Sequence, residues 1–513
     1  MAKRTVFVRE ATGLIKNVGF LDAVSLNMAS MSVGLALATI GYTMALLPSI
    51  SGVNLIYASV IGFVFSVPQM IVYTMMITRM PRTAGDYVWI SRSLNGRFAA
   101  ALALMGGAGG SGQAAAFTAL TVLATTFSIG SFGVFLGYQS MMGLSLPGNI
   151  SGSNPILQVI VGIAIFIALI FVVIVKPKAG YKMMSLLIAI GIVTMILAMV
   201  VLVTAGVQGT QTYLESLGAN LTYTAVASSY TGPSFALGPN LFILPFFAIY
   251  VFPWINGGAT VASEIKGKST LKWNVLIGAV LSMGLMTAGF AAMYYAGGFE
   301  FTNAALANAT LVYNYSFNFW TWAMGVSSTP VIGWLIGIGE IAWNLAVMMQ
   351  AIVIFSRYIF AFAFDRFLPA KFAYVSSHGS PVYAHLLQLI LAVIFVGIGA
   401  LLYGPFSSLY GAVLSGVIYF LFVGVAALVY GMRQEKGSAR VVLAISGAAM
   451  ALVYLFLSYE FLEYPSVWGG NTLAYFYIAI SFVIGLIVYQ LSKSYHMRQG
   501  IDIDLAFKQI PPE

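Results

Sequence analysis

The residues of this chain that could carry out chemistry are few, and the most informative one lies inside a long apolar segment. Glu340 is the one carboxylate placed well within such a segment. An ionised acid at the centre of a membrane helix costs about 2.5–3.5 kcal/mol, so an unpaired spectator is not expected there. Because burial favours the neutral carboxyl group and a nearby cation favours the charged one, Glu340 is a candidate for proton coupling or for binding an amine. The alternative is a protonated glutamate that hydrogen bonds to a neighbouring helix and holds the bundle together.

Backbone groups supply a second kind of candidate site, because two apolar segments contain helix-breaking residues near their middle. Residues 30–34 read Ser-Met-Ser-Val-Gly, and residues 252–258 read Phe-Pro-Trp-Ile-Asn-Gly-Gly. Unpaired backbone groups are tolerated in a membrane only where they line a cavity or a ligand site. Interrupted helices five spans apart point to a 5+5 inverted repeat with a site between its halves. The alternative is that these are ordinary small packing residues.

Other chemistry is restricted by composition. The absence of cysteine excludes a disulfide framework, thiolate metal sites and a cysteine nucleophile. Three histidines leave little material for a metal centre, so we expect no metal and no other cofactor. The 23 basic and 14 acidic residues are too few for a nucleic-acid-binding protein, although the net charge is +9.

The elements that position these groups must be membrane helices. Sixty per cent of the 513 residues are hydrophobic and only 7% are charged, against about 25% charged in a soluble domain. A protein so poor in charge could not cover a surface in water, so lipid must surround most of it. A helix needs about 20 apolar residues to cross the hydrocarbon core. The sequence predicts twelve spans, over residues 20–46, 54–78, 97–128, 155–176, 182–206, 240–263, 272–296, 329–356, 381–403, 407–431, 440–460 and 472–492.

Basic residues predict how these spans are oriented, because loops that stay in the cytoplasm retain Lys and Arg. With twelve spans, all 23 basic residues fall on one side, which places both termini in the cytoplasm and the protein in the plasma membrane. A single missed or invented helix would scatter them. The basic groups lie within residues 1–19, 79–97, 176–182, 266–272, 357–371, 433–440 and 493–508.

The opposite loops are rich in Ser, Thr, Asn, Gly and Tyr and contain every Asn-x-Ser/Thr sequon of the chain. These sequons are possible glycosylation sites on the outer face. By composition alone they are also common in such loops. They are Asn149, Asn220, Asn308 and Asn314.

The chain is therefore divided by its spans rather than by soluble domains. A cytoplasmic segment (1–19) precedes helices 1–5 (20–206), the first repeat. An extracytoplasmic loop (207–239) leads to helices 6–10 (240–431), the second repeat. Helices 11–12 (432–492) and a cytoplasmic tail (493–513) complete the chain.

Several motifs at the predicted cytoplasmic edge together indicate a family. After the second span the chain reads MPRTAGDYVWISRSLNG (residues 80–96), with a proline, a small-Gly pair, an aromatic residue and Ser-Arg in that order. After the eighth it reads SRYIFAFAFDRFLPAKFAYV (residues 356–375). Leu21-Asp22 in helix 1, and Glu264 with Lys266 after helix 6, add weaker matches. Together these resemble the amino acid–polyamine–organocation (APC) superfamily of permeases, from about residue 20 to residue 385.

This resemblance implies an all-α LeuT-type fold, with ten core helices in the inverted repeat and two more, and transport by alternating access. In the family the unwound parts of helices 1 and 6 hold the carboxylate and amino groups of an amino acid. A broken helix also offers a free N-terminus to an anion and free carbonyls to a cation. The substrate-site residues implied are Ser30, Met31, Ser32, Val33, Gly34, Phe252, Trp254, Ile255, Asn256 and Gly257.

Some positions depart from the family pattern. Only Gly34 remains of the Gly-Ser-Gly run of helix 1. Helix 5 has no embedded lysine of the kind used by some proton-coupled members, and Thr194 lies near that place. Helix 8 has no Ser or Thr between Thr329 and Ser356, where sodium-coupled relatives draw hydroxyl ligands. A proton is therefore the expected coupling ion, and sodium is disfavoured.

Charged residues near the cytoplasmic edge are predicted to form ion pairs that lock the inner gate. Single exposed pairs contribute only about 0–1 kcal/mol, so we expect a network. Its predicted members are Asp22, Arg82, Asp86, Glu264, Lys266, Arg357 and Asp365, with Arg92 as a further basic partner.

These observations predict a proton-coupled or uncoupled amino acid permease whose partners are a small-molecule substrate and the lipid bilayer. A permease for amines, polyamines or cationic amino acids is the alternative with the same fold, with Glu340 countering the substrate charge. An integral-membrane enzyme would need clustered His, Asp or Glu, and a channel would show charge rings or a filter repeat. Neither pattern is visible in the sequence.

Overall fold

The computed structural model describes residues 12–107, 113–136, 155–217, 221–313, 317–402 and 411–511. The regular structure of these residues is helical. Two isolated β-bridges, Val18 with Ile265 and Thr83 with Val261, are single residue pairs rather than strands. A helix satisfies its own backbone hydrogen bonds, which is what an apolar segment needs in lipid.

Eleven spans within the described residues are long and apolar enough to cross a membrane. Eleven of the twelve predicted spans correspond to a single helix or to consecutive pieces of one; the exception is the span at 97–128. The eleven are α1–α2 (Phe20–Met44), α3 (Leu55–Arg79), α7 (Pro155–Val175), α8 (Pro177–Ser216), α10–α12 (Leu237–Thr260), α13 (Lys268–Gly297), α17 (Pro330–Phe364), α18 (Val382–Gly397) with the turn after it (span Val382–Leu401), α20 (Val413–Gln434), α21 (Gly437–Glu463) and α23 (Thr472–Met497).

The predicted span at 97–128 corresponds to two helices, α5 (Gly96–Gly106) and α6 (Gln113–Leu136). Residues 108–112 between them lie outside the described part of the chain. The count of twelve spans and their arrangement in two repeats therefore remain predictions.

Side-chain caps begin several of these helices where the sequence changes from polar to apolar. Asn54 Oδ1 accepts from the N–H groups of Ile56 and Tyr57 at the start of α3. Thr329 accepts from Ile332 at the start of α17, where Pro330 takes the first position. Such caps satisfy N–H groups that have no acceptor inside the helix.

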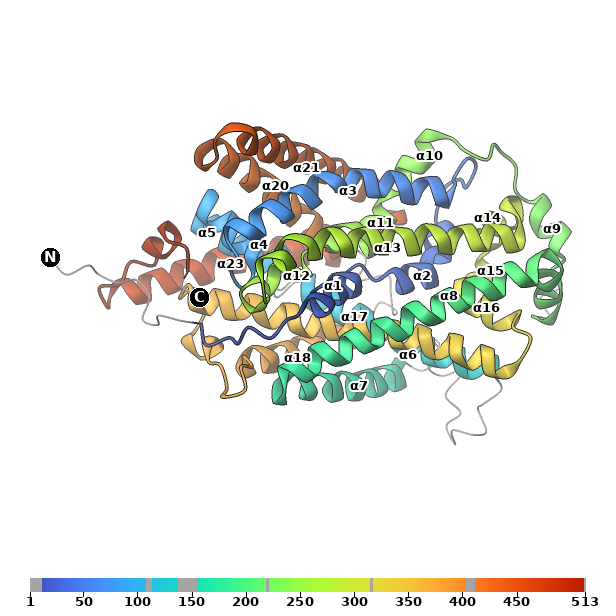
Figure 1. Cartoon of the computed structure of the whole chain (residues 1–513), viewed down its shortest axis with the longest axis horizontal. Helices are drawn as coiled ribbons and strands as arrows, with labels where there is room; N and C mark the ends of the chain where they lie inside the picture. Colours follow the sequence, from blue (N-terminus) through green and yellow to red (C-terminus); the bar gives the residue numbers. More distant parts are fainter. Residues whose placement is uncertain are drawn as a thin grey trace.

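The molecule has two distinct ends (Figure 1). The described part of the chain begins and ends at one of them, on the side of α4 (Gly85–Ser93) and α12 (Gly257–Thr260). Predicted cytoplasmic loops meet there, because Arg79 at the end of α3 pairs with Glu435 after α20. We call this the basic end. The short helices α9 (Tyr223–Ser228), α14 (Phe299–Ala307) and α15 (Ala309–Tyr313) gather at the opposite end.

The interrupted helices lie inside the bundle. Side chains of α1–α2, α10–α12 and α17 are almost all buried, whereas most side chains of α7 and α23 are at least partly exposed. An outer helix can face lipid with apolar side chains, but an inner helix must fit against its neighbours. The segments with helix-breaking residues are therefore enclosed by protein.

Two segments predicted as loops contain helices. The helix α8 continues past residue 206 to Ser216, with a non-helical kink at Gly206 (φ 56°, ψ −158°). Residues 297–328 contain α14, α15 and α16 (Phe319–Gly325). The helix α17 also continues to Phe364, eight residues beyond the predicted boundary at 356.

Candidate functional site at the two interrupted helices

The first interruption separates α1 (Phe20–Ser30) from α2 (Val33–Met44). Ser32 has φ 23° and ψ 46°, a conformation that a non-glycine residue adopts only at a cost of roughly 1–3 kcal/mol. Its hydroxyl donates to the carbonyl of Tyr250 at 2.6 Å, so it is used outside α2. No side chain caps the N-terminus of α2. The first N–H groups of α2, including those of Val33 and Gly34, are thus left for another acceptor.

The second interruption lies between α11 (Leu244–Tyr250) and α12, with a 3₁₀ turn at Phe252–Trp254. Pro253 has no N–H to continue the helix. Its carbonyl accepts from Gln69 Nε2 at 2.9 Å. Asn256 is fully buried, and its Oδ1 has no donor in the described part of the chain. This oxygen is a free acceptor at the centre of the bundle.

Small residues and amides hold the two interruptions together. Asn27 of α1 accepts from the Gly258 N–H at 2.7 Å and donates to Asn274 Oδ1 of α13 at 2.8 Å. A Cβ atom at Gly258 would lie 2.0 Å from that Oδ1, and one at Gly257 would lie 2.8 Å from Ser30 Oγ. Only glycine allows this approach of α12 to α1.

Two other predicted site residues point to different neighbours. The ring of Phe252 stacks on Phe247 of α11, with 5.7 Å between centroids, and packs against Gly62 of α3. The ring of Trp254 packs against Phe420 of α20 at 5.5 Å, and its Nε1 donates to a carbonyl of α11. These rings pack the second interruption against α3, α11 and α20. Ile255 and Met31 are fully buried.

A tryptophan borders the first interruption. The ring of Trp343 in α17 lies between two glycines, because added Cβ atoms would approach it to 2.4 Å from Gly34 and 2.6 Å from Gly191 of α8. Its Nε1 is buried and has no acceptor among the described residues. By contrast, Trp320 Nε1 donates to the Gly34 carbonyl at 2.9 Å. One indole N–H therefore remains unused beside the interruption.

Glu340 is 1% exposed and lies in α17, one turn before Asn344. Its Oε1 accepts from Ser128 Oγ of α6 at 3.0 Å, and Ser128 in turn accepts from Asn344 Nδ2 at 2.7 Å. At the preceding residue, Gly339, a Cβ atom would lie 1.7 Å from Thr194 Oγ1 of α8. A bundle-holding glutamate would make this contact with α6, and the same contact would pass a change of protonation to α6.

A buried ion pair closes the basic end beside the second interruption. Arg357 of α17 is fully buried and donates to both carboxylate oxygens of Glu264, at 2.9 and 3.0 Å. Tyr181 of α8 donates to the same carboxylate at 3.1 Å. The pair thus links three helices, and breaking it would leave a buried charge without a partner.

The N-terminal segment is fixed to the same place. Val18 donates to the Glu264 carbonyl at 3.0 Å and accepts from the Lys266 N–H at 2.9 Å. Lys266 therefore contributes its backbone, and its side chain is exposed. Asp22 pairs with Lys182 of α8 at 3.2 Å and accepts from Ser185 at 2.9 Å.

The predicted ionic role of Asp86 is wrong for the described structure. Asp86 is fully buried, and hydroxyl groups rather than cations surround it. Tyr73 and Tyr419 donate to it at 3.0 and 3.1 Å, Tyr358 donates as well, and Asn256 Nδ2 lies at 3.4 Å. Burial raises the pKa of the Asp86 carboxyl, while the hydrogen bonds from the tyrosines act in the opposite direction. Asp86 therefore joins the second interruption to α3, α17 and α20.

The ion pair of this region is formed by Arg92 and Asp365 instead. Arg92 donates to both oxygens of Asp365, at 2.6 and 2.8 Å, and Tyr87 donates to the same carboxylate at 2.8 Å. Arg82 donates to the carbonyl of Pro511 in the tail. The pairing predicted from sequence thus links α4 to the end of α17, and Asp86 does not take part in it.

Polar side chains that the sequence analysis did not single out complete the region. Asn27 and Asn274 connect the interrupted helices, and Gln350 Oε1 accepts from Ser30 at 3.1 Å. Each is an amide within a predicted span. A polar side chain in an apolar helix is itself a signal of function or of helix contact.

The predicted glycosylation sites are only partly covered by the structure. Asn149, Asn220 and Asn314 lie outside the described residues. Asn308 is half-buried at the end of α14, and its Oδ1 accepts from Thr310 N at 3.0 Å. Its glycosylation remains a prediction.

Comparison with known proteins identifies the family. A family model described as "Amino acid permease" matches residues 18–491. The chain is also similar to a curated protein, "Uncharacterized protein 399" of Sulfolobus islandicus rod-shaped virus 1, with 33% identity over 90 residues. That match covers 18% of this chain and 22% of the viral protein. The family match covers nearly the whole helix bundle, and the described residues include eleven spans long and apolar enough to cross a membrane. The chain belongs to the amino acid permease family of the APC superfamily.

Proposed function

We propose that this permease is a secondary active transporter that carries amino acids across the plasma membrane by alternating access and is coupled to protons. The observation that carries the proposal is the meeting of two interrupted helices at residues with unused polar groups. An amino acid carries one carboxylate and one ammonium group, so its site needs donors and acceptors within one short distance of each other.

The N-terminus of α2 supplies the donors. It has no side-chain cap, and Ser32, the residue in the capping position, donates its hydroxyl to Tyr250 instead. The free N–H groups of Val33 and Gly34 and the positive end of the helix dipole suit a carboxylate. The Trp343 Nε1–H beside Gly34 is a further donor without an acceptor in the described residues.

The second interruption supplies the acceptors. Asn256 Oδ1 is buried and unpaired within the described residues. Leaving such a group unsatisfied costs about 1–3 kcal/mol, which a bound ammonium group would recover. Because Asn256 Nδ2 also reaches Asp86, occupancy of the site would be felt at the basic end.

The contacts at the basic end supply the gate. The pair of Glu264 with Arg357 joins the residues after α12 to α17, and the pair of Asp22 with Lys182 joins α1 to α8. The segment that enters α1 is bound to Glu264 through its backbone. Opening this end requires both pairs to separate or move together. We assign the gate to them, to the Arg92–Asp365 pair and to the hydroxyl cluster around Asp86.

We assign proton coupling to Glu340. It is a buried carboxyl group in a span, hydrogen bonded to a different helix through Ser128. A change in its charge therefore alters the contact between α17 and α6. Sodium is disfavoured because α17 offers no hydroxyl group between Pro330 and Phe355.

An amine or polyamine permease is the second candidate, and the same glutamate favours it. An amine has no carboxylate for the N-terminus of α2, but its positive charges suit Glu340 and Asn256 Oδ1. The two candidates differ in which end of the site they use.

Uptake by proteoliposomes separates them. The purified protein would be given radiolabelled neutral amino acids, cationic amino acids and polyamines, with and without an inside-alkaline pH gradient. Accumulation of an amino acid that depends on the gradient is the expected result. Transport of amines that lack a carboxylate, without transport of amino acids, would replace the first proposal by the second. Amino acid uptake that needs a sodium gradient would contradict proton coupling.

A further inference from the structure

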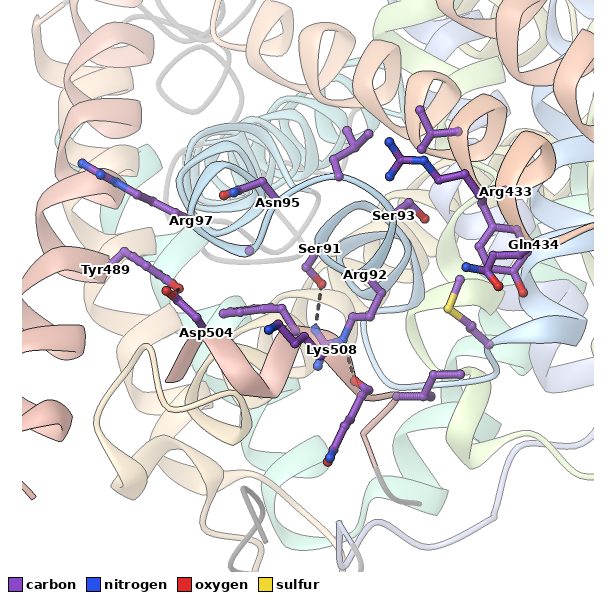
Figure 2. A pocket seen from close by; sticks show the side chains of 18 of the residues that line it. Ser91, Arg92, Ser93, Asn95, Arg97, Arg433, Gln434, Tyr489, Asp504 and Lys508 are labelled. Carbon is purple, nitrogen blue, oxygen red and sulfur yellow. Dashed lines mark hydrogen bonds between the residues drawn. The ribbon is translucent and has the colours of Figure 1, made fainter. Parts of the chain in front are cut away.

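A cavity of about 800 Å³ lies at the basic end, and none of its lining residues belongs to the interrupted helices (Figure 2). It is formed where the C-terminal tail, with the 3₁₀ helix η7 (Ile503–Lys508), folds back onto the start of α5 and the ends of α20 and α23. Cavities of about 300–1,000 Å³ are typical of small-molecule sites. The transport site proposed above does not use this space, and of the proposed gate residues only Arg92 lines it.

The tail that forms one wall is held by specific contacts. The ring of Phe507 lies directly on Gly96, where a Cβ atom would come within 2.2 Å of the ring. The guanidinium of Arg92 lies 5.3 Å from the centroid of the same ring and donates to the Gln509 carbonyl at 3.1 Å. The wall is therefore part of the folded structure, and Arg92 is already neutralised by Asp365.

The cavity has excess positive charge. Five basic residues and one acid line it. Lys493 pairs with Asp504, the acid. Burial by itself would raise the pKa of the Asp504 carboxyl, but hydrogen bonds from Lys493 and Tyr489 outweigh it and lower the pKa, so this pair is charged and neutral overall at pH 7.

Three basic residues remain without an ion pair in the described part of the chain: Arg97, Arg433 and Lys508. Figure 2 shows Arg97 on one side of the view, with its guanidinium turned away from the other labelled residues, Arg433 on the other side, and Lys508 between them. Like charges lining one space repel each other, and an anion in that space would reverse the sign of the interaction.

Uncharged donors at the cavity have no acceptor either. Ser93 is 7% exposed and lines the cavity, and its Oγ has no partner among the described residues. A buried hydroxyl without a partner is uncommon in folded proteins. The N-terminus of α5 lies beside it. There Asn95 Oδ1 accepts from the Phe98 N–H, which leaves the N–H groups of Gly96 and Arg97 without that cap. A ligand with several acceptor oxygens and a negative charge fits these donors.

We propose that this cavity binds a phosphate group, presented by the headgroup of an anionic phospholipid or by a soluble phosphate. Phosphate supplies a negative charge as a partner for Arg97, Arg433 and Lys508. It also supplies acceptor oxygens for the Ser93 hydroxyl group. The cavity lies at the ends of spanning helices, the level at which headgroups lie, and basic pockets between such helices bind lipid headgroups. Leu94, Val429 and Ile510 add an apolar part to its lining.

The test measures thermal unfolding of the purified full-length protein in detergent. Short-chain phosphatidylglycerol, short-chain phosphatidylcholine and inorganic phosphate are each titrated, because a ligand that binds the folded state raises the apparent Tm. The variants are the triple substitution Arg97→Gln, Arg433→Gln, Lys508→Gln and the single substitution Ser93→Val. A matched triple, Lys178→Gln, Lys268→Gln, Lys371→Gln, removes the same charge from exposed positions that do not line the cavity.

We expect phosphatidylglycerol to stabilise the parent more than phosphatidylcholine does. The cavity triple should need a roughly tenfold higher concentration for half the effect, Ser93→Val a severalfold higher one, and the matched triple the parent's concentration. The lipid is the source of the phosphate if inorganic phosphate has no effect, and a soluble phosphate is the source if it reproduces the stabilisation. An equal loss in both triples, or no response of the parent to any phosphate, would overturn the proposal. Uptake assays are independent of it, so its failure leaves the proposed transport function unaffected.

Discussion

At the scale of single residues, Ser32 and Asn256 occupy corresponding places in the two interrupted helices but use their side chains differently. The Ser32 hydroxyl ties α2 to the carbonyl of Tyr250, which leaves the N-terminus of α2 uncapped. Asn256 leaves its side-chain oxygen, Oδ1, unused in the described structure. In the proposed function, the first residue leaves donors for the substrate carboxylate, and the second provides an acceptor for its ammonium group.

The substitution Asn256→Leu tests this difference. It removes the free acceptor and the contact with Asp86 without changing side-chain volume greatly. We expect the apparent affinity for substrate to fall by about tenfold or more, because one hydrogen bond to a charged group is worth about 1.5–3 kcal/mol. Uptake kinetics in proteoliposomes measure the change, and an unchanged KM would move the site elsewhere.

Ser32→Ala has a matched control. Ser458 of α21 is also buried and donates to a backbone carbonyl, that of Tyr454, at 2.7 Å. We expect Ser32→Ala to lower uptake and Ser458→Ala to leave it at the parent's level, with both proteins inserted in the membrane. Equal effects of the two substitutions would mean that loss of a buried hydrogen bond, rather than of the site, lowers transport.

Glu340→Gln tests the assignment of proton coupling. Glutamine keeps an oxygen that can accept from Ser128, but it cannot change its charge. We therefore expect loss of accumulation driven by a pH gradient, with exchange of substrate across the membrane partly retained. A variant that accumulates substrate like the parent at every external pH would make Glu340 a structural residue. Loss of binding only for cationic substrates would favour the amine permease.

At the scale of the elements, the close contact of α1, α12 and α13 depends on Gly258. A Cβ atom there would overlap Asn274 Oδ1, whereas one at Gly284 of α13 would meet nothing within 4 Å. We expect Gly258→Ala to destabilise the protein by about 1–3 kcal/mol, as overpacking does. Gly284→Ala should leave the apparent Tm unchanged or slightly higher, because alanine favours a helix. Equal Tm values for the two variants would contradict the close packing.

The pair of Glu264 and Arg357 joins three helices at the basic end. Removing one partner of a buried ion pair costs about 3–5 kcal/mol, but replacing both by apolar residues is often neutral. We therefore expect Arg357→Met to lower the apparent Tm and to reduce transport. The double variant Arg357→Met, Glu264→Leu should recover stability but not transport. Recovery of full transport would show that the pair holds the bundle together and does not act as a gate.

At the scale of the whole molecule, the distribution of charge divides the bundle into two ends, and this predicts how it lies in the membrane. Residues 297–328 are expected outside the cell and residues 358–380 inside it. The chain has no cysteine, so Asn308→Cys and Ser377→Cys can be labelled without background. In intact cells an impermeant maleimide should label the first variant alone, and after permeabilisation it should label both. Labelling of Ser377→Cys in intact cells would overturn the orientation.

Much of this architecture could be predicted from the sequence, because a membrane imposes strong one-dimensional rules. Apolar length determines which segments can span, and the structure has helices over all the predicted segments, with α5 and α6 sharing one of them. Proline, asparagine and paired glycines in one short stretch disfavour a continuous helix, so the second interruption could be predicted from residues 252–258. Boundaries were less predictable. α17 extends through Arg357 because neighbouring helices bury that arginine, which the sequence alone places in a loop.

Contacts between distant residues were decided only by the tertiary structure. The carboxylate of Asp86 could be predicted to matter, but its partners could not. Whether it would face arginines or the hydroxyl groups of Tyr73, Tyr358 and Tyr419 depends on how α3, α17 and α20 meet. By itself the sequence determined the membrane class and the apolar segments, and it predicted where two helices are interrupted, because these follow from local chemistry and hydrophobicity. Only the tertiary structure decided the partners of each polar group, because a buried hydrogen bond or ion pair requires two side chains far apart in sequence to meet within about 3 Å.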